Sequence, residues 1–223
     1  FVSAEALEND NFDTFGYKTN KTGIEIGTNF EYLNDLYLGI ANSNFYEKIE
    51  TNSTASALQK KQEGNYWDSF VSLDLNYDKR NQKFQTNSGF KSFYSIDFPV
   101  ISDTNTIKNY YNYSHYFEFF EKNFSSISVY LESANSLNNK DIKLSERITI
   151  PSSRLRGFEA GRIGPKDGDD YVGGNYAYSI NFKSNIPQIF EESQNLDFLF
   201  FADAADIWGV DYDSSIKGDG IRS

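Results

Sequence analysis

The chain lacks several features that define common classes of protein. None of its 223 residues is cysteine, which excludes a disulfide framework and a cysteine-based zinc site. It contains no run of about eighteen apolar residues, so the sequence predicts no transmembrane helix. His115 is the only histidine, and no Gly-x-Ser-x-Gly nucleophile elbow accompanies it. We therefore expect a protein that is not an enzyme and that needs no metal and no cofactor.

The charge and the aromatic content restrict the remaining classes. With 21 basic and 32 acidic residues the net charge is -11, which argues against nucleic acid as a partner. The mean hydropathy is -0.60, yet the chain has 16 tyrosines and 20 phenylalanines. A polar chain with many aromatic residues is typical of a membrane β-barrel wall, because only alternate residues meet lipid and aromatic rings gather at both interfaces.

Apolar and polar residues alternate with a period of two, which predicts β-strands. Between residues 66 and 78 one face reads Trp67, Ser69, Val71, Leu73, Leu75 and Tyr77. The other face reads Asp68, Phe70, Ser72, Asp74, Asn76 and Asp78. A helix would scatter both sets around its axis, whereas a strand separates them.

About nine segments show this alternation, and most are ten to thirteen residues long. They lie at about 1–9, 21–32, 36–47, 66–78, 89–100, 108–120, 125–135, 174–185 and 195–208. A soluble β-sandwich gives the same alternation, but its strands are usually five or six residues long. The greater length suits a tilted crossing of an apolar band ~25 Å tall, which favours an all-β, transmembrane, antiparallel up-and-down barrel.

Short and long connections alternate along the chain, as they do in such barrels. The tight turns at 33–35 and 121–123 contrast with long connections at 48–65 and 136–173. Membrane barrels place long loops outside the cell, so this parity assigns the long connections to the external side. An open sheet in lipid leaves unpaired backbone groups at its edges. We therefore interpret residues 1–223 as one partial barrel domain, with the remaining strands outside this sequence.

The long connection at 136–173 is the most informative segment. It leads through Leu155, Arg156, Gly157 and Phe158, then Ile163, Gly164 and Pro165, to Gly173, Gly174 and Asn175. Arg156 offers a planar five-donor fork, and Gly157 leaves room for the backbone beside it. Folded back against a lumen carboxylate, this arginine would form a charge-assisted latch. A solvated arginine on an ordinary exposed loop is the equal alternative from the residues alone.

These motifs resemble the BamA family of outer-membrane protein assembly factors. That family carries (Val/Ile)-Arg-Gly-Phe, Ile-Gly-Pro and Gly-Gly-Asn in this order in its sixth external loop. Residues 77–90 look like its Tyr-Asp-x-Arg-Asp turn, and 200–208 look like its Phe-Phe-x-Asp-x-Gly-x-Val-Trp strand. The resemblance covers essentially the whole chain and implies strands five to thirteen of a sixteen-stranded barrel. The periplasmic POTRA domains and the terminal strands would lie outside the chain.

The resemblance also implies residue roles. Arg156 would reach into the lumen with Asp203 as its carboxylate partner, supported by the Ile-Gly-Pro and Gly-Gly-Asn segments. Where the family usually has a second lumen carboxylate, this chain has Lys183. The latch would then rest on Asp203 alone or recruit another acid such as Asp197.

The function implied is the assembly and insertion of β-barrel proteins in the outer membrane of a Gram-negative bacterium. The expected partners are client outer-membrane β-barrel proteins, the lipid bilayer, and accessory lipoproteins that bind through the POTRA domains. Alternatives in the same superfamily are the translocation and assembly factor TamA and a two-partner secretion transporter. A general porin and a soluble β-sandwich adhesin are further alternatives.

Overall fold

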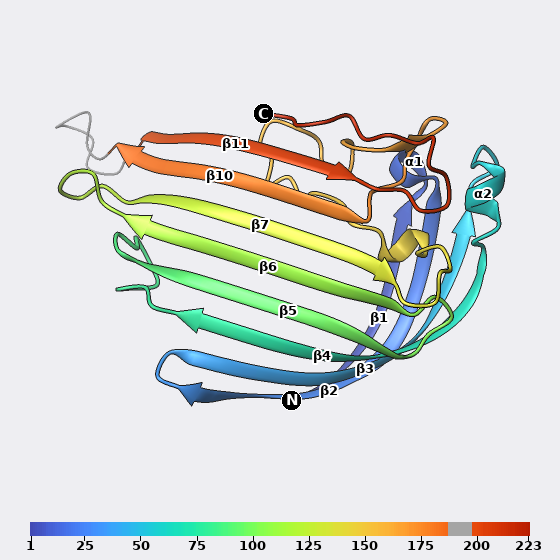
Figure 1. Cartoon of the computed structure of the whole chain (residues 1–223), viewed down its shortest axis with the longest axis horizontal. Helices are drawn as coiled ribbons and strands as arrows, with labels where there is room; N and C mark the ends of the chain where they lie inside the picture. The colour runs from blue at the N-terminus through green and yellow to red at the C-terminus, as the bar shows by residue number, and fades with distance from the viewer. Residues whose placement is uncertain (187–197) are drawn as a thin grey trace.

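The computed structural model describes residues 1–186 and 198–223, and most of them belong to one curved antiparallel sheet (Figure 1). The sheet strands are β1 (Val2–Asn11), β2 (Tyr17–Leu33), β3 (Leu36–Thr51), β4 (Gly64–Asp78), β5 (Gly89–Ile101), β6 (Thr106–Phe117), β7 (Ser125–Ser136), β10 (Tyr176–Ile186) and β11 (Phe198–Trp208). The other elements are α1 (Phe12–Phe15), α2 (Ala57–Lys60), the 3-10 turn η1 (Leu144–Glu146), β8 (Lys166–Asp167) and β9 (Asp170–Tyr171).

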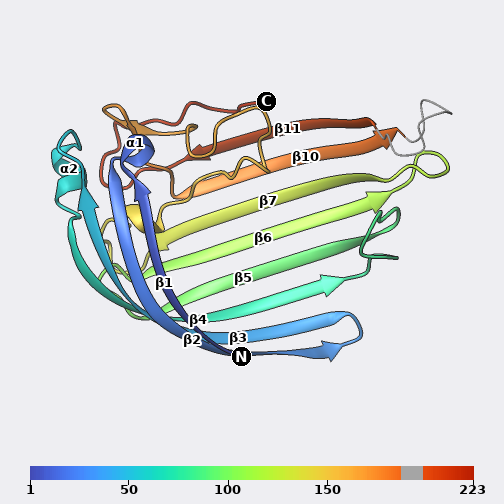
Figure 2. The same cartoon turned by 180° about the vertical axis from the view of Figure 1, so that it is seen from behind.

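The strands follow one another around the sheet in chain order. The order is β1-β2-β3-β4-β5-β6-β7-β10-β11, and every neighbouring pair is antiparallel. Among the strands of the described residues, only the small hairpin β8-β9 lies outside this sheet. The prediction of nine antiparallel strands in up-and-down order is confirmed, and the strongly curved sheet has the shape of part of a barrel wall (Figures 1 and 2).

The two faces of the sheet have opposite characters. The register pairs Leu73 of β4 with Ile96 of β5, and the next pair toward the end of β4 is Asp74 with Ser95. The convex face exposes large apolar side chains, among them Leu73, Leu75, Ile127, Leu131 and Ile180. Polar side chains of the concave face are buried or half-buried, among them Asp68, Ser72 and Asp97. The period-two pattern therefore separates a lipid face from a lumen face, as expected from the sequence.

Several strands are longer than the alternation predicts. β2 has 17 residues, β3 has 16 and β4 has 15. The added residues at the end of β3 include Lys48 and Glu50, which interrupt the apolar pattern but continue the ladder with β2. A β-ladder is held by backbone groups, so it runs past the point where side-chain hydrophobicity stops marking it. The predicted residues 195–197 lie outside the described residues.

The connections gather at two opposite ends of the sheet. We call the loop end the one that carries residues 12–16, 52–63, 102–105 and 137–175, and the turn end the opposite one (Figure 1). Within the described part of the chain, no helix is long and apolar enough to cross a membrane. On the side of β11 away from β10, Ala205 forms an antiparallel bridge with Arg222.

An added positive charge should affect the free energy of unfolding differently on the two faces of the sheet. Leu73→Arg puts a cation on the lipid face and should lower the free energy of unfolding in a bilayer by about 2–4 kcal/mol. Ser95→Arg puts the same cation into a lumen cavity beside Asp97 and Glu132, and should change that energy by less than about 1 kcal/mol. Denaturant unfolding in lipid vesicles measures both values, and equal losses would contradict the assignment of faces.

Candidate functional site

Residues 137–175, which we call the long loop, fold into the concave side of the sheet (Figure 2). Ile142, Ile148 and Leu155 are each at most 3% exposed. They share one apolar cluster with side chains of the sheet. The cluster consists of Tyr130, Ala134, Ile142, Ile148, Ile150, Leu155, Ile163, Ala177, Ala205 and Ile207, with Tyr110 and Phe158 packed at its margin. Because so much apolar surface is removed from water, the long loop is a packed part of the lumen.

Two glycines of the predicted motifs allow this path. Gly157 follows Arg156 with φ +89°, a conformation that side-chain-bearing residues rarely adopt. Gly164 has φ +93°, and a Cβ there would lie 2.2 Å from Cγ2 of Ile207. Gly164 therefore lets the loop backbone approach β11 closely. Leu155 enters the apolar cluster two residues before Gly157, and Ile163 enters it directly before Gly164.

The structure brings Arg156 and Asp203 together. The guanidinium donates from Nε to Oδ2 of Asp203 at 2.7 Å and from Nη2 to Oδ1 at 2.6 Å. The backbone N–H of Arg156 donates to the same Oδ2 at 3.0 Å. The Asp203 side chain is 3% exposed and that of Arg156 is 27% exposed. This is a bidentate, charge-assisted pair between the long loop and the lumen face of β11.

Two further residues complete this contact, which we call the latch. Asn181 on β10 pairs in register with Asp203 and donates from Nδ2 to its Oδ1 at 2.8 Å. The same amide group donates to the carbonyl of Arg154 at 2.8 Å. The Arg156 guanidinium also lies 3.9 Å from the ring centroid of Phe201. Hydrogen bonds and a cation–π contact therefore fix the plane of the guanidinium.

The Gly-Gly-Asn segment joins the far end of the long loop to the wall. Gly174 forms an antiparallel bridge with Ile148, inside the loop. The backbone N–H of Asn175 donates to the carbonyls of Trp208 and Gly209 at 3.0 and 2.8 Å. Gly173 precedes this bridge, and Pro165 is fully buried. These residues therefore shape the loop and join its end to β11.

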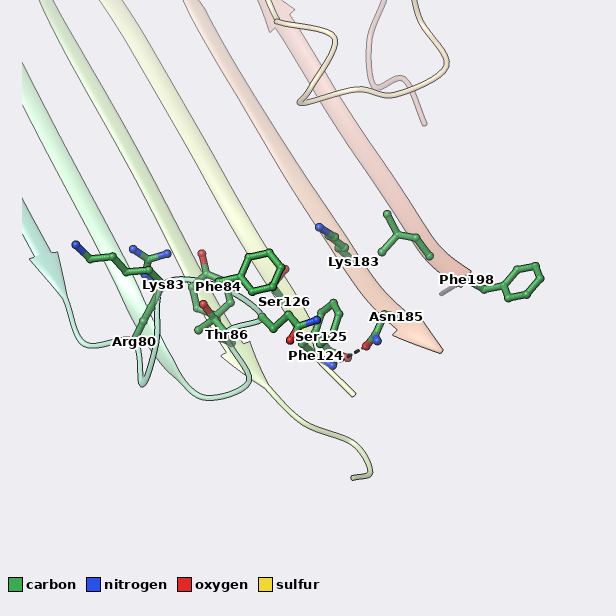
Figure 3. Close-up of a pocket in the computed structure, with 13 residues that line it drawn as sticks. Arg80, Lys83, Phe84, Thr86, Phe124, Ser125, Ser126, Lys183, Asn185 and Phe198 are labelled. Carbon is green, nitrogen blue, oxygen red and sulfur yellow. Dashed lines mark hydrogen bonds between the residues drawn. The ribbon is translucent and has the colours of Figure 1, made fainter. Parts of the chain in front are cut away.

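Lys183 lies beside the latch on β10. It is two residues beyond Asn181 and therefore on the same lumen face, with Phe201 and Ser126 as its register partners. It lines a cavity at the turn end (Figure 3). Among the described residues it makes no ion pair, whereas the Arg156 guanidinium pairs with Asp203 and donates to the carbonyl of Phe182. Asp203 is thus supplemented by the neutral Asn181, while Asp197, the alternative acid, lies outside the described residues.

A second charged cluster anchors the long loop on the opposite wall. Lys143 is 1% exposed and forms ion pairs with Asp68 of β4, with Glu47 of β3 at 3.4 Å and with Glu146 at 3.4 Å. Its ammonium also lies 4.9 Å from the centroid of the Tyr66 ring. We call these residues the lysine hub. The long loop is therefore tied to β3 and β4 at its start and to β11 at Arg156.

The charges of the lysine hub support one another. Burial alone would lower the pKa of Lys143, but Glu146, Glu47 and Asp68 outweigh burial and raise it. Burial would raise the pKa of Glu146, yet Lys108, Lys143 and the hydroxyl of Thr106 bring it below its ordinary value. A carboxyl group with a lowered pKa stabilises the fold above its unfolded pKa, and that stabilisation is lost as the pH falls through the folded value.

Sequence reasoning missed Lys143 and Asn181. Alternation places Asp68 on the lumen face, but nothing local connects it with a lysine 75 residues later. Asn181 could have been found, because its position two residues before Lys183 gives it the same face and the register pairs it with Asp203. The acidic run at 167–170, which lacks the ligand spacing of a calcium loop, forms the turn of the β8-β9 hairpin.

A curved antiparallel sheet with a lipid face, a polar lumen face and a loop packed inside defines the wall of a membrane β-barrel. The model of the Omp85 superfamily domain matches residues 1–223. The chain belongs to the Omp85 superfamily, a family of outer-membrane barrels that includes assembly and insertion factors.

Two known proteins show what the chain is similar to. A crystal structure of BamA from Haemophilus ducreyi lacking POTRA domains 1-3 superposes with a TM-score of 0.81 at 19% identity, over 93% of this chain and 46% of that one. A SAM50-like protein of Schizosaccharomyces pombe is 37% identical over 82 residues, which is 35% of this chain and 17% of that protein. The chain thus spans less than half the length of either. The predicted resemblance to the BamA fold is confirmed.

The latch should govern the local stability of the long loop. Asp203→Asn removes the charge that two guanidinium donors share, so opening of residues 154–158 should become easier by about 2 kcal/mol. Hydrogen exchange of these backbone amides measures the change. Asp206→Asn, on the other face of the same strand, is the matched control and should leave the exchange rates unaltered. Unchanged exchange in Asp203→Asn would contradict the latch.

The lysine hub should matter more for global stability. Lys143→Gln leaves three buried carboxylates without their cation and should lower the free energy of unfolding by about 3–5 kcal/mol at neutral pH. The deficit should shrink in acid, because protonated carboxyls no longer need the ammonium. Denaturant unfolding in detergent at several pH values measures this. Lys140→Gln, at an exposed position of the same loop, should cost almost nothing, and a similar loss there would argue against the hub.

Proposed function

We propose that this chain forms part of the central barrel of a machine that assembles β-barrel proteins and inserts them into the outer membrane. Membership of the Omp85 superfamily and the likeness of its fold to BamA support this proposal. The work needs no covalent chemistry, because a client strand gains stability when its backbone groups pair with an exposed strand edge.

The observation that carries the proposal is the latch. A barrel that receives client strands must open part of its wall while the rest keeps its shape. Arg156 and Asp203 join the long loop to β11, and the lysine hub joins the same loop to β3 and β4. The loop is therefore a brace that holds this part of the wall while strands pair elsewhere in the protein.

The partners follow from this role. The lipid face of the sheet contacts the bilayer, and the clients are other outer-membrane β-barrel proteins. Accessory lipoproteins would bind through POTRA domains of the full-length protein. We assign the protein to the outer membrane of a Gram-negative bacterium, on the strength of the BamA-like fold. The identity with a SAM50-like protein of Schizosaccharomyces pombe favours, as a second setting, the outer membrane of a mitochondrion.

Charge reversal at the latch tests the proposal. In the full-length protein, Asp203→Arg places two cations face to face and should reduce client assembly at least tenfold, since the latch would be replaced by repulsion of more than about 1.4 kcal/mol. The measurement is the folding of a radiolabelled client barrel into proteoliposomes that hold the purified machine.

The control is Glu159→Arg, the same reversal at an exposed position of the long loop, whose ion pair with Arg162 is open to solvent. It should assemble clients at the wild-type rate. Normal assembly by Asp203→Arg would refute the role of the latch. Export of an unfolded passenger across the vesicle membrane, without client insertion, would instead indicate a secretion transporter.

A further inference from the structure

A cavity of about 470 Å³ lies at the turn end of the sheet (Figure 3). The connection between β4 and β5 lines one side of it with Arg80, Lys83 and Phe84. Strands β7, β10 and β11 line the other side, and Lys183 stands among them. We call this space the mouth cavity. No residue of the latch or of the lysine hub lines it, so the role proposed above leaves its residues unexplained.

The mouth cavity concentrates positive charge in a chain whose net charge is -11. Asp78 neutralises Arg80 through hydrogen bonds of 2.8 and 2.6 Å to the guanidinium. In the part of the chain that the structure describes, no carboxylate pairs with Lys83 or Lys183. Lys83 and Lys183, from distant parts of the sequence, therefore both line one cavity without an ion-pair partner among the described residues, which favours an anionic ligand.

Aromatic and amide groups stand beside these cations. Phe84 is 79% exposed at the tip of its turn, and Phe124 lines the floor. Asn185 is 2% exposed, and its Oδ1 accepts from the backbone N–H of Phe124 at 2.6 Å. Its Nδ2 donor has no partner among the described residues. An exposed ring and an unsatisfied buried donor both carry a free-energy cost, which a ligand with an apolar group and a carbonyl oxygen would remove.

The position of the mouth cavity selects the kind of ligand. Lys183 and Ser126 are register partners on the lumen face, whereas their neighbour Ile127 is exposed on the lipid face. A bilayer lipid therefore does not reach the cavity, but a polypeptide in the aqueous lumen does. Carboxylates of such a polypeptide match the two lysines, its aromatic side chains match Phe84, and its backbone carbonyls match the amide of Asn185.

We propose that the mouth cavity binds an acidic, aromatic segment of polypeptide. This proposal rests on the proposed function, because we take the bound segment to belong to a client protein at the turn end of the barrel. Lys83 and Lys183 hold its carboxylates, Phe84 packs against its ring, and the amide of Asn185 donates to its backbone. Lys183 is then a ligand-binding residue.

Peptide binding to the full-length protein in neutral detergent tests this site. The probe is a short fluorescent peptide in which phenylalanines flank two glutamates, and its twin has glutamines instead. Lys83→Glu and Lys183→Glu should each weaken binding of the acidic peptide roughly tenfold, and added salt should weaken binding to the wild type. Lys140→Glu, an exposed lysine at the loop end, is the matched control and should bind like the wild type.

Three results would overturn the proposal. They are wild-type affinity in both cavity variants, equal binding of the glutamine twin, and displacement of the peptide by inorganic phosphate at the peptide's own concentration, which would mark a simple anion site. Both substitutions lie at solvent-accessible positions, and circular dichroism verifies that the sheet is intact. Peptide binding is measured without clients, so its failure leaves the proposed function standing. A failure of client assembly, in turn, leaves the peptide result unaffected.

Discussion

Charge compensation inside the lumen is the interaction on which the position of the long loop depends. Moving a lysine or an arginine out of water costs several kcal/mol unless a carboxylate meets it there. Lys143 meets acids of β3 and β4, and Arg156 meets Asp203 of β11. The two cations enter opposite walls, so the loop cannot leave the lumen without breaking both contacts. Because these two contacts fix the long loop, the apolar cluster between them stays buried.

Two kinds of contact, apolar packing and a charged hydrogen-bonded pair, hold the long loop in the lumen. Apolar side chains such as Ile142 and Leu155 supply burial, which depends little on direction. The bidentate pair of Arg156 and Asp203 supplies direction, because two parallel hydrogen bonds hold the carboxylate in the plane of the guanidinium. The loop therefore combines a stable packing with a defined orientation, and removing either kind of contact would have a different effect.

Much of the fold follows from the sequence because a membrane wall repeats one local rule. Alternation from Trp67 to Asp78 gives both faces of β4, and similar patterns locate the other strands. The motif around Arg156, with the family resemblance, pointed to Asp203. The lysine hub could not be predicted, because Lys143 is far from Glu47 and Asp68 in the sequence. The three residues meet only when the long loop folds into the concave side of the curved sheet. The ends of β2 and β3 were missed since backbone pairing continues beyond the apolar pattern.

The length of β2 and β3 has a consequence for what the protein presents to its surroundings. At a rise of about 3.3 Å per residue, the 17 residues of β2 extend over roughly 55 Å, more than twice an apolar band ~25 Å tall. Even when tilted, this hairpin stands well above the hydrocarbon. Lys48 and Glu50 form their 2.6 Å ion pair on its outer face. An antibody approaching from the loop end therefore meets rigid, hydrogen-bonded sheet, an epitope whose shape depends on folding and not on a linear peptide.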